Sequence, residues 1–206
     1  MIAAFETASS DGSVALATPD GALIAMSGWT GDQRQGSSLL PRLLELLAEH
    51  RRTLAELRAV AVGTGPGSFT GLRAAMSLAK GFAFSLSLPL VGLPSLPAWL
   101  AADPEATAAL ARAGAREAYL LERGAMTPAI HSFDDLSAMP RDTALAVPLE
   151  LAAALALTRG RPPHGAAAAL AAAAAVRLAA DPGGDDLDLL EPFYLRPPRG
   201  LTATQP

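Results

Sequence analysis

The 206-residue chain contains no cysteine at all. This absence excludes disulfides, thiolate metal sites and a cysteine nucleophile. Lysine is nearly absent as well, because Lys80 is the only one and arginine supplies the other cations. With a net charge of −4 and only 17% charged residues, we expect no broad basic surface for binding nucleic acid directly.

Histidines and long apolar runs are also scarce. The three histidines, His50, His131 and His164, lie far apart with no pair at helical ligand spacing, so we expect neither a metal site nor a protease triad. The longest apolar run, residues 166–176, is too short and too rich in alanine to span a bilayer. No basic region precedes the apolar N-terminal stretch. We therefore expect a soluble, cytoplasmic, globular protein with no membrane partner.

The most informative segment present is a run of glycines after a short apolar stretch at residues 59–62. The apolar stretch predicts a buried strand. Ser68 or Thr70 can then cap a long apolar helix that ends near residue 86, before Pro89. Such a strand, turn and helix can aim backbone N–H groups at a phosphate. We call this segment the glycine loop, and its candidate residues are Gly63, Gly65, Gly67, Ser68, Thr70 and Gly71.

The glycine loop matches none of the common ligand motifs. It is not a Walker A loop, because no Gly-Lys-Ser/Thr follows it. It also misses the dinucleotide pattern, since Thr70 stands where the third glycine is required, and its spacing around Ser68 is wrong for a nucleophile elbow. We interpret it as a structural turn and leave binding of an anion open.

The remaining pattern predicts an α/β protein with two domains, residues 1–103 and 104–206. Strands alternate with helices in the first half, which favours a mainly parallel sheet with an antiparallel edge. In the second half, two strands joined at Gly124 predict a hairpin. The expected strands are 2–6, 13–17, 22–26, 59–62, 89–93, 117–122, 125–133 and 143–147. The expected helices are 38–52, 68–86, one capped by Ser95, 149–157 and 165–180.

Two of these helices carry more apolar surface than one sheet needs. The leucines of residues 38–52 cover an arc of roughly 160°, against about 100° for a single packing face. The ordinary interpretation is a helix deep in the core; the alternative is a second face for a partner. We predict that Leu39 or Leu46 lies on the outer edge. The predicted partner-binding residues are Leu39, Leu43, Leu46, Arg73, Met76, Ser77, Lys80 and Phe84, with Arg73 and Lys80 near the rim.

Three stretches together resemble the TsaB (YeaZ) family. Residues 63–73 followed by 89–93 are similar to its glycine loop and next strand. Phe5-Glu6-Thr7 with Ser13-Val14-Ala15-Leu16 is similar to its first two strands, and Phe193-Tyr194-Leu195-Arg196 to its C-terminal ending. The resemblance implies an actin-like, sugar-kinase-like (ASKHA) α/β fold, with two related lobes whose mixed sheets are flanked by helices.

The resemblance also implies a function. The chain would be a non-catalytic partner subunit of the TsaD transferase, which forms N6-threonylcarbamoyladenosine next to the anticodon of tRNAs. It would form a heterodimer with TsaD, contact TsaE through the complex and tRNA only indirectly, and form a homodimer when alone. It would need no cofactor. The sequence departs from the family pattern at Glu6, where aspartate is usual, at Gly36, where histidine often stands, and at Arg112, where aspartate is common.

Two alternatives remain open at this point. An autonomous sugar-kinase-like ATPase or phosphotransferase would need acids that hold Mg²⁺ in two phosphate loops. Glu6 and Asp11 could serve the first loop, but around residues 112–119 Glu117 is the only acid. The other alternative is a homodimeric module with no link to tRNA.

Overall fold

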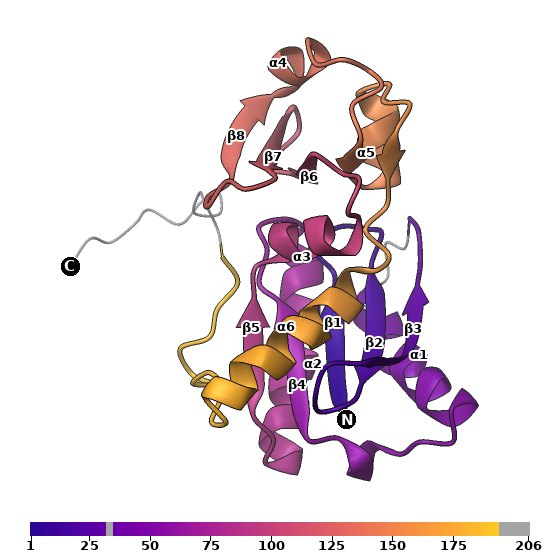
Figure 1. Ribbon diagram of the computed structural model, residues 1–206, viewed down its shortest axis with the longest axis vertical. Helices are drawn as coiled ribbons and strands as arrows, with labels where there is room; N and C mark the ends of the chain where they lie inside the picture. Colours follow the sequence, from indigo (N-terminus) through magenta and orange to yellow (C-terminus); the bar gives the residue numbers. More distant parts are fainter. Residues whose placement is uncertain (32–34, 194–206) are drawn as a thin grey trace, which may run out of the picture.

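The computed structural model describes residues 1–31 and 35–193 and comprises two stacked lobes (Figure 1). The first lobe contains a five-stranded sheet with the order β3-β2-β1-β4-β5. β1 pairs in parallel with β4, and β4 with β5, whereas β2 and β3 form an antiparallel edge. The bounds are β1 (Ile2–Glu6), β2 (Ser13–Ala17), β3 (Leu23–Gly28), β4 (Ala59–Gly63) and β5 (Leu90–Leu93).

Helices cover both faces of this sheet. Figure 1 shows α6 crossing in front of the strands and α2 behind them. The larger strand residues, such as Phe5, Val60 and Val62, pack with the leucines of α1 and α2, while Ala4 and Ala61 pack with α6. This division follows from the period of two along a strand, which sends successive side chains to opposite faces. The helices are α1 (Gln35–Glu49), α2 (Phe69–Leu86), α3 (Ser95–Ala102) and α6 (Ala166–Ala180).

The second lobe is built on another five-stranded sheet, with the order β10-β9-β6-β7-β8. The predicted hairpin is confirmed as the antiparallel pair β7 and β8. The sequence did not predict β6, the central strand. The bounds are β6 (Ala108–Arg112), β7 (Glu117–Glu122), β8 (Ala129–Ser132), α4 (Phe133–Ser137), β9 (Leu145–Ala146), α5 (Leu149–Ala154) and β10 (Gly160–Arg161), and a 3-10 turn, η1 (Leu54–Glu56), precedes β4.

The chain crosses twice between the lobes. It leaves the first lobe after α3 and returns as α6, whose alanines pack on β1, β2 and β4 of the first sheet. The division into residues 1–103 and 104–206 stays a prediction, and a cut at residue 103 would separate α6 from the sheet that it covers. A shared apolar cluster joins the lobes and includes Leu72, Trp99, Ala109, Tyr119 and Leu121.

None of the helices within the described ranges is both long and apolar enough to cross a bilayer.

Candidate functional site

The glycine loop is packed tightly against its own lobe. Gly65 has φ +96°, and a Cβ there would lie 2.7 Å from Cδ1 of Leu72. A Cβ on Gly67 would lie 2.1 Å from the carbonyl oxygen of Ala8, which accepts a hydrogen bond from the amide of Ser68 at 2.6 Å. Glycine is required at these positions because the backbone approaches its neighbours closely. This packing supports the interpretation of the loop as a structural turn.

The loop leads into α2 through the predicted cap. Ser68 is the N-cap residue, and its hydroxyl accepts a hydrogen bond from the amide of Gly71 at 3.2 Å. The predicted cap at Ser95 is wrong. Pro94 occupies the N-cap position of α3, and the Ser95 hydroxyl instead accepts a hydrogen bond from the amide of Gly65 at 3.1 Å. Ser95 therefore braces the glycine loop from a neighbouring helix.

Glu6 lies at the end of β1, behind the loop, and is completely buried. Its Oε1 accepts a hydrogen bond from the amide of Ala8 at 2.7 Å, whereas Oε2 has no hydrogen-bond partner in good geometry. Burial raises the pKa of Glu6 to about 7, although the nearby Ser95 and Trp99 side chains lower it in part. Close contact with Gly63, where a Cβ would lie 2.2 Å from Oε2, encloses the carboxyl group in the interior.

Asp11, the other acid of the first lobe that could have served a metal, is also engaged. Its side chain is only 1% exposed. Oδ1 accepts a hydrogen bond from the amide of Gly31 at 2.7 Å, and Oδ2 accepts one from the amide of Leu149 at 2.5 Å. Among the described residues, no group of three or more histidine or acidic side chains is placed to hold a metal ion.

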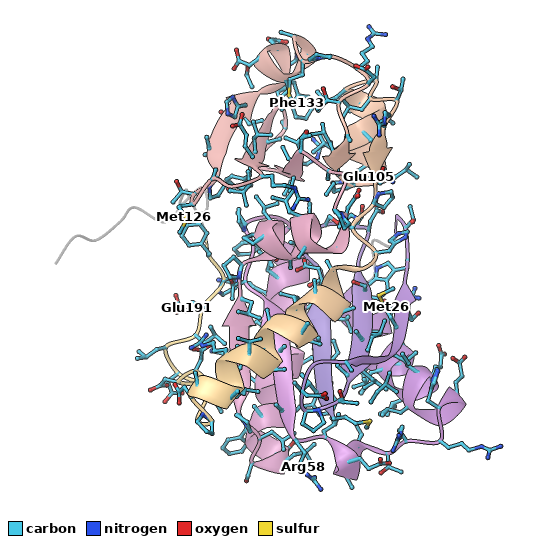
Figure 2. All side chains as sticks on the ribbon, viewed as in Figure 1. Met26, Arg58, Glu105, Met126, Phe133 and Glu191 are labelled. Carbon is cyan, nitrogen blue, oxygen red and sulfur yellow. The ribbon has the colours of Figure 1, made fainter. Side chains whose placement is uncertain are left out.

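A cleft of about 440 Å³ opens between the lobes. Residues 67–71 of the glycine loop line one wall, and Arg112, Ala113, Gly114, Pro148 and Glu150 line the other. Glu150 is the only carboxylate among the described lining residues, and it forms an ion pair with Arg112 at 3.4 Å. Arg112 also lies 5.5 Å from the ring centre of Phe133, which Figure 2 labels in the second lobe. A cation at this wall disfavours Mg²⁺ there.

The outward face of α1 and α2 is a second candidate site. The prediction for Leu39, Leu43, Leu46 and Met76 is wrong, because these side chains are at most 4% exposed and pack in the core of the first lobe. The leucine arc of α1 runs from Leu46 at one end to Leu44 at the other, and α1 is rotated so that the Leu46 end faces the sheet.

The residues that do face outward come from the opposite end of that arc and from the polar side of α2. Leu40 and Leu44 are 39% and 43% exposed, and Phe84 is 82% exposed. Arg73 and Ser77 are exposed, and Lys80 is half-buried. Gly81 faces open space, with no atom within 4 Å of a Cβ built on it. We call this surface the α1–α2 face, and its residues are Leu40, Leu44, Arg73, Ser77, Lys80, Gly81 and Phe84.

Sequence reasoning missed Leu40 and Leu44 as surface residues. No local signal marks them as exposed, because the residues that flank their end of the leucine arc, Pro41 and Ala48, carry no charge. Burial of the other edge depends on how α1 is rotated on the sheet, which periodicity does not determine.

Two mixed sheets on either side of a cleft, with a glycine loop at the start of a long helix, define a two-lobed actin-like α/β protein. The model of the family "TsaD: tRNA N6-adenosine threonylcarbamoyltransferase" matches residues 33–139. An uncharacterized Mycobacterium tuberculosis protein, Rv3421c, is 37% identical over 164 residues, which cover 78% of this chain and 74% of the relative. The chain belongs to the TsaB (YeaZ) family.

Other relatives agree with this assignment. The Escherichia coli "tRNA threonylcarbamoyladenosine biosynthesis protein TsaB" is 38% identical over 58 residues, which cover 28% of this chain and 25% of the relative. YeaZ from Pseudomonas aeruginosa has the same fold, with a TM-score of 0.69 at 24% identity over 94% of this chain and 99% of that structure. A Pseudomonas aeruginosa protein described as similar to peptidase YeaZ superposes with a TM-score of 0.71 at 25% identity, over 95% and 99% of the two chains.

Proposed function

We propose that this protein is a non-catalytic partner subunit of a TsaD transferase in the formation of N6-threonylcarbamoyladenosine in tRNA. The observation that carries the proposal is the α1–α2 face, on which Leu40, Leu44 and Phe84 are exposed on two neighbouring helices. Large apolar side chains grouped on a surface are typical of a protein interface. Arg73 and Lys80 lie on the same side of α2 as Phe84, at helical spacing, and can set the orientation of a partner that carries acidic residues.

The dimensions of the face suit a stable complex. α1 has 15 residues and α2 has 18, so the longer helix spans about 27 Å at 1.5 Å per residue. A pair of helices of this length can bury the roughly 800 Å² per partner of a standard interface. We propose that TsaD binds here and that a second copy of this chain occupies the same face when TsaD is absent. TsaE and tRNA then contact this chain only through the complex.

The cleft supports a non-catalytic role. In the kinase alternative, acids from both lobes would hold Mg²⁺. Here Glu6 and Asp11 are buried in other contacts, and Glu150 is paired with Arg112. No observation within the described residues favours the kinase alternative, and we do not propose it. In a reaction reconstituted with TsaD, TsaE, tRNA and the donor threonylcarbamoyl-adenylate, omission of this chain should abolish modification, while this chain alone should hydrolyse no ATP.

The interface is tested with Leu44→Asp, because a charge at an exposed apolar position opposes association without disturbing the core. We expect this variant to lose co-elution with TsaD and to be monomeric by light scattering, with an unchanged circular dichroism melt. Val176→Asp is the matched control, since Val176 is 74% exposed on α6, across the sheet from α1 and α2. It should retain both associations. Retention of TsaD by Leu44→Asp and by Phe84→Asp would contradict the proposed face.

A further inference from the structure

Asp11 connects the two lobes through a single buried carboxylate. It lies in the turn between β1 and β2, where the Ser9 hydroxyl donates a hydrogen bond to the carbonyl oxygen of Asp11 at 2.8 Å. One carboxylate oxygen accepts the amide of Gly31, on the segment that leads into α1. The other accepts the amide of Leu149, the first residue of α5 in the second lobe. The carboxylate therefore holds one segment of each lobe.

The start of α5 lacks a cap of its own. Pro148 is the N-cap residue and has no side-chain oxygen to accept the free amides of the first turn. Asp11, 138 residues away in the sequence, provides that acceptor from the other lobe. Hydrogen bonds from amides to a carboxylate are shorter and stronger than those between neutral groups, more so when they are buried.

The same contact lies at the wall of the cleft. Ser9 and Ser10, which precede Asp11, line the cleft on the first lobe, and Pro148 and Glu150, which flank Leu149, line it on the second. A change in the Asp11 to Leu149 distance therefore changes the separation of these two walls. The shared apolar cluster also joins the lobes, but apolar contacts lack the directionality of a hydrogen bond.

We propose that Asp11 is an interlobe latch, a positioning residue that sets the width of the cleft by holding α5 of the second lobe against the first. This device is independent of the partner role proposed above, because every group in it belongs to one chain. Release of the latch lets α5 move away from Ser9 and Ser10 and widens the cleft. Since Asp11 is occupied by two backbone amides, it is also withheld from any cation that enters the cleft.

The latch is tested from both sides. Leu149→Pro deletes the amide hydrogen that Asp11 binds and puts a ring carbon in its place, while proline remains compatible with the first position of a helix. The preceding residue, Pro148, already has ψ 144°, which suits a residue before proline. Leu149→Ala is the matched control, because it shortens the same half-exposed side chain and keeps the amide. Asp11→Ala removes both acceptor oxygens and breaks the latch from the other side without adding an atom.

Cleft width is measured as the distance between two spin labels on cysteines introduced at Glu45 of α1 and Asp142 of the second lobe, both exposed. Labelling is specific because the chain has no cysteine of its own. We expect Leu149→Ala to keep the wild-type distance distribution, and Leu149→Pro and Asp11→Ala to shift it to longer, broader distances. The double variant of Asp11→Ala and Leu149→Pro should shift it no further than Asp11→Ala alone, because both changes break the same contact.

Hydrogen exchange gives a second measurement. In Asp11→Ala, we expect protection of the Leu149 amide to fall at least about tenfold, with protection in the core of the first sheet unchanged. Identical distance distributions for Leu149→Pro and Leu149→Ala would overturn the proposal. A wild-type distribution in Asp11→Ala overturns it equally, whether or not Leu149→Pro folds. Neither measurement involves TsaD, so failure of the latch is distinct from failure of the proposed function.

Discussion

The two faces of the first sheet are packed in different ways. On the side of α1 and α2, large side chains such as Phe5, Val62 and Leu43 fill the layer. On the side of α6, both the sheet and the helix contribute mostly alanine to the buried cluster, for example Ala4 of β1 and Ala171 of α6. Small residues on both surfaces let a helix lie close to a sheet without leaving apolar area for a partner. The leucine-rich side has more apolar residues than its layer can bury, and the excess forms the α1–α2 face.

The largest expected effect is on the free energy of unfolding when a buried leucine of α1, and not an exposed one, is replaced. Leu43 is fully buried, so Leu43→Ala should lower the free energy of unfolding by about 2–5 kcal/mol through lost burial and a cavity. Leu44→Ala, one position on, should change it by no more than about 0.5 kcal/mol. Urea unfolding of the two variants measures the difference, and similar losses would contradict the assigned rotation of α1.

A variant of Glu6 tests the face of the first sheet that α6 covers. Side chains alternate between the two faces along β1, so Glu6 lies on the same side as Ala4. Its pKa of about 7 in the folded protein lies above the ordinary value of 4.5. The folded state therefore binds more protons than the unfolded state between these values, so stability should fall as pH rises from about 4.5 to 7. The free energy of unfolding of the wild type, measured with urea, should therefore be lower at pH 8 than at pH 5, by on the order of 3 kcal/mol. Glu6→Gln should remove this difference. If the free energy of unfolding changes equally with pH in the wild type and in Glu6→Gln, the raised pKa assigned to Glu6 is wrong.

The close approach of α6 predicts a smaller effect. Ala171 is fully buried, and Ala171→Leu should destabilise the fold by about 1–3 kcal/mol because the layer has no room for a larger side chain. Val176→Leu, at an exposed position of the same helix, should leave the melting temperature within error. If Ala171→Leu is as stable as the wild type, the layer between α6 and the sheet has room for a larger side chain, which would contradict the prediction.

The smallest effect compares two glycines. Gly65→Ala should cost about 1 kcal/mol or more, because of its positive φ and the contact with Leu72. Gly81→Ala should instead stabilise the monomer by about 0.5–1 kcal/mol, since Gly81 lies within α2 and faces open space. Thermal melts of the two variants show whether each change lowers or raises stability. If Gly65→Ala melts as the wild type does but loses affinity for a nucleotide, the loop is a ligand site and does not need this glycine for its fold.

Local patterns identified the elements of the first lobe. Every strand and helix expected there is present, with ends shifted by three residues or fewer, and Ser68 caps α2 as predicted. The central strand β6 was missed, because Ala-Ala-Leu-Ala-Arg contains no β-branched or aromatic residue. It is a strand because β7 and β9 pair with it on either side. The Tyr-Leu-Arg part of the C-terminal resemblance lies outside the described residues.

The sequence by itself determined the alternation of strands and helices, the glycine loop, the width of the leucine arc and the family, since these depend on the identity and spacing of nearby residues. Only the tertiary structure decided which end of the leucine arc faces outward, because that depends on how α1 rests on its sheet. It also decided that Ser95 braces the glycine loop from 30 residues away, and that Asp11 binds amides 20 and 138 residues distant. A side chain's partners across such separations are set by the packing of whole elements, which no local pattern encodes.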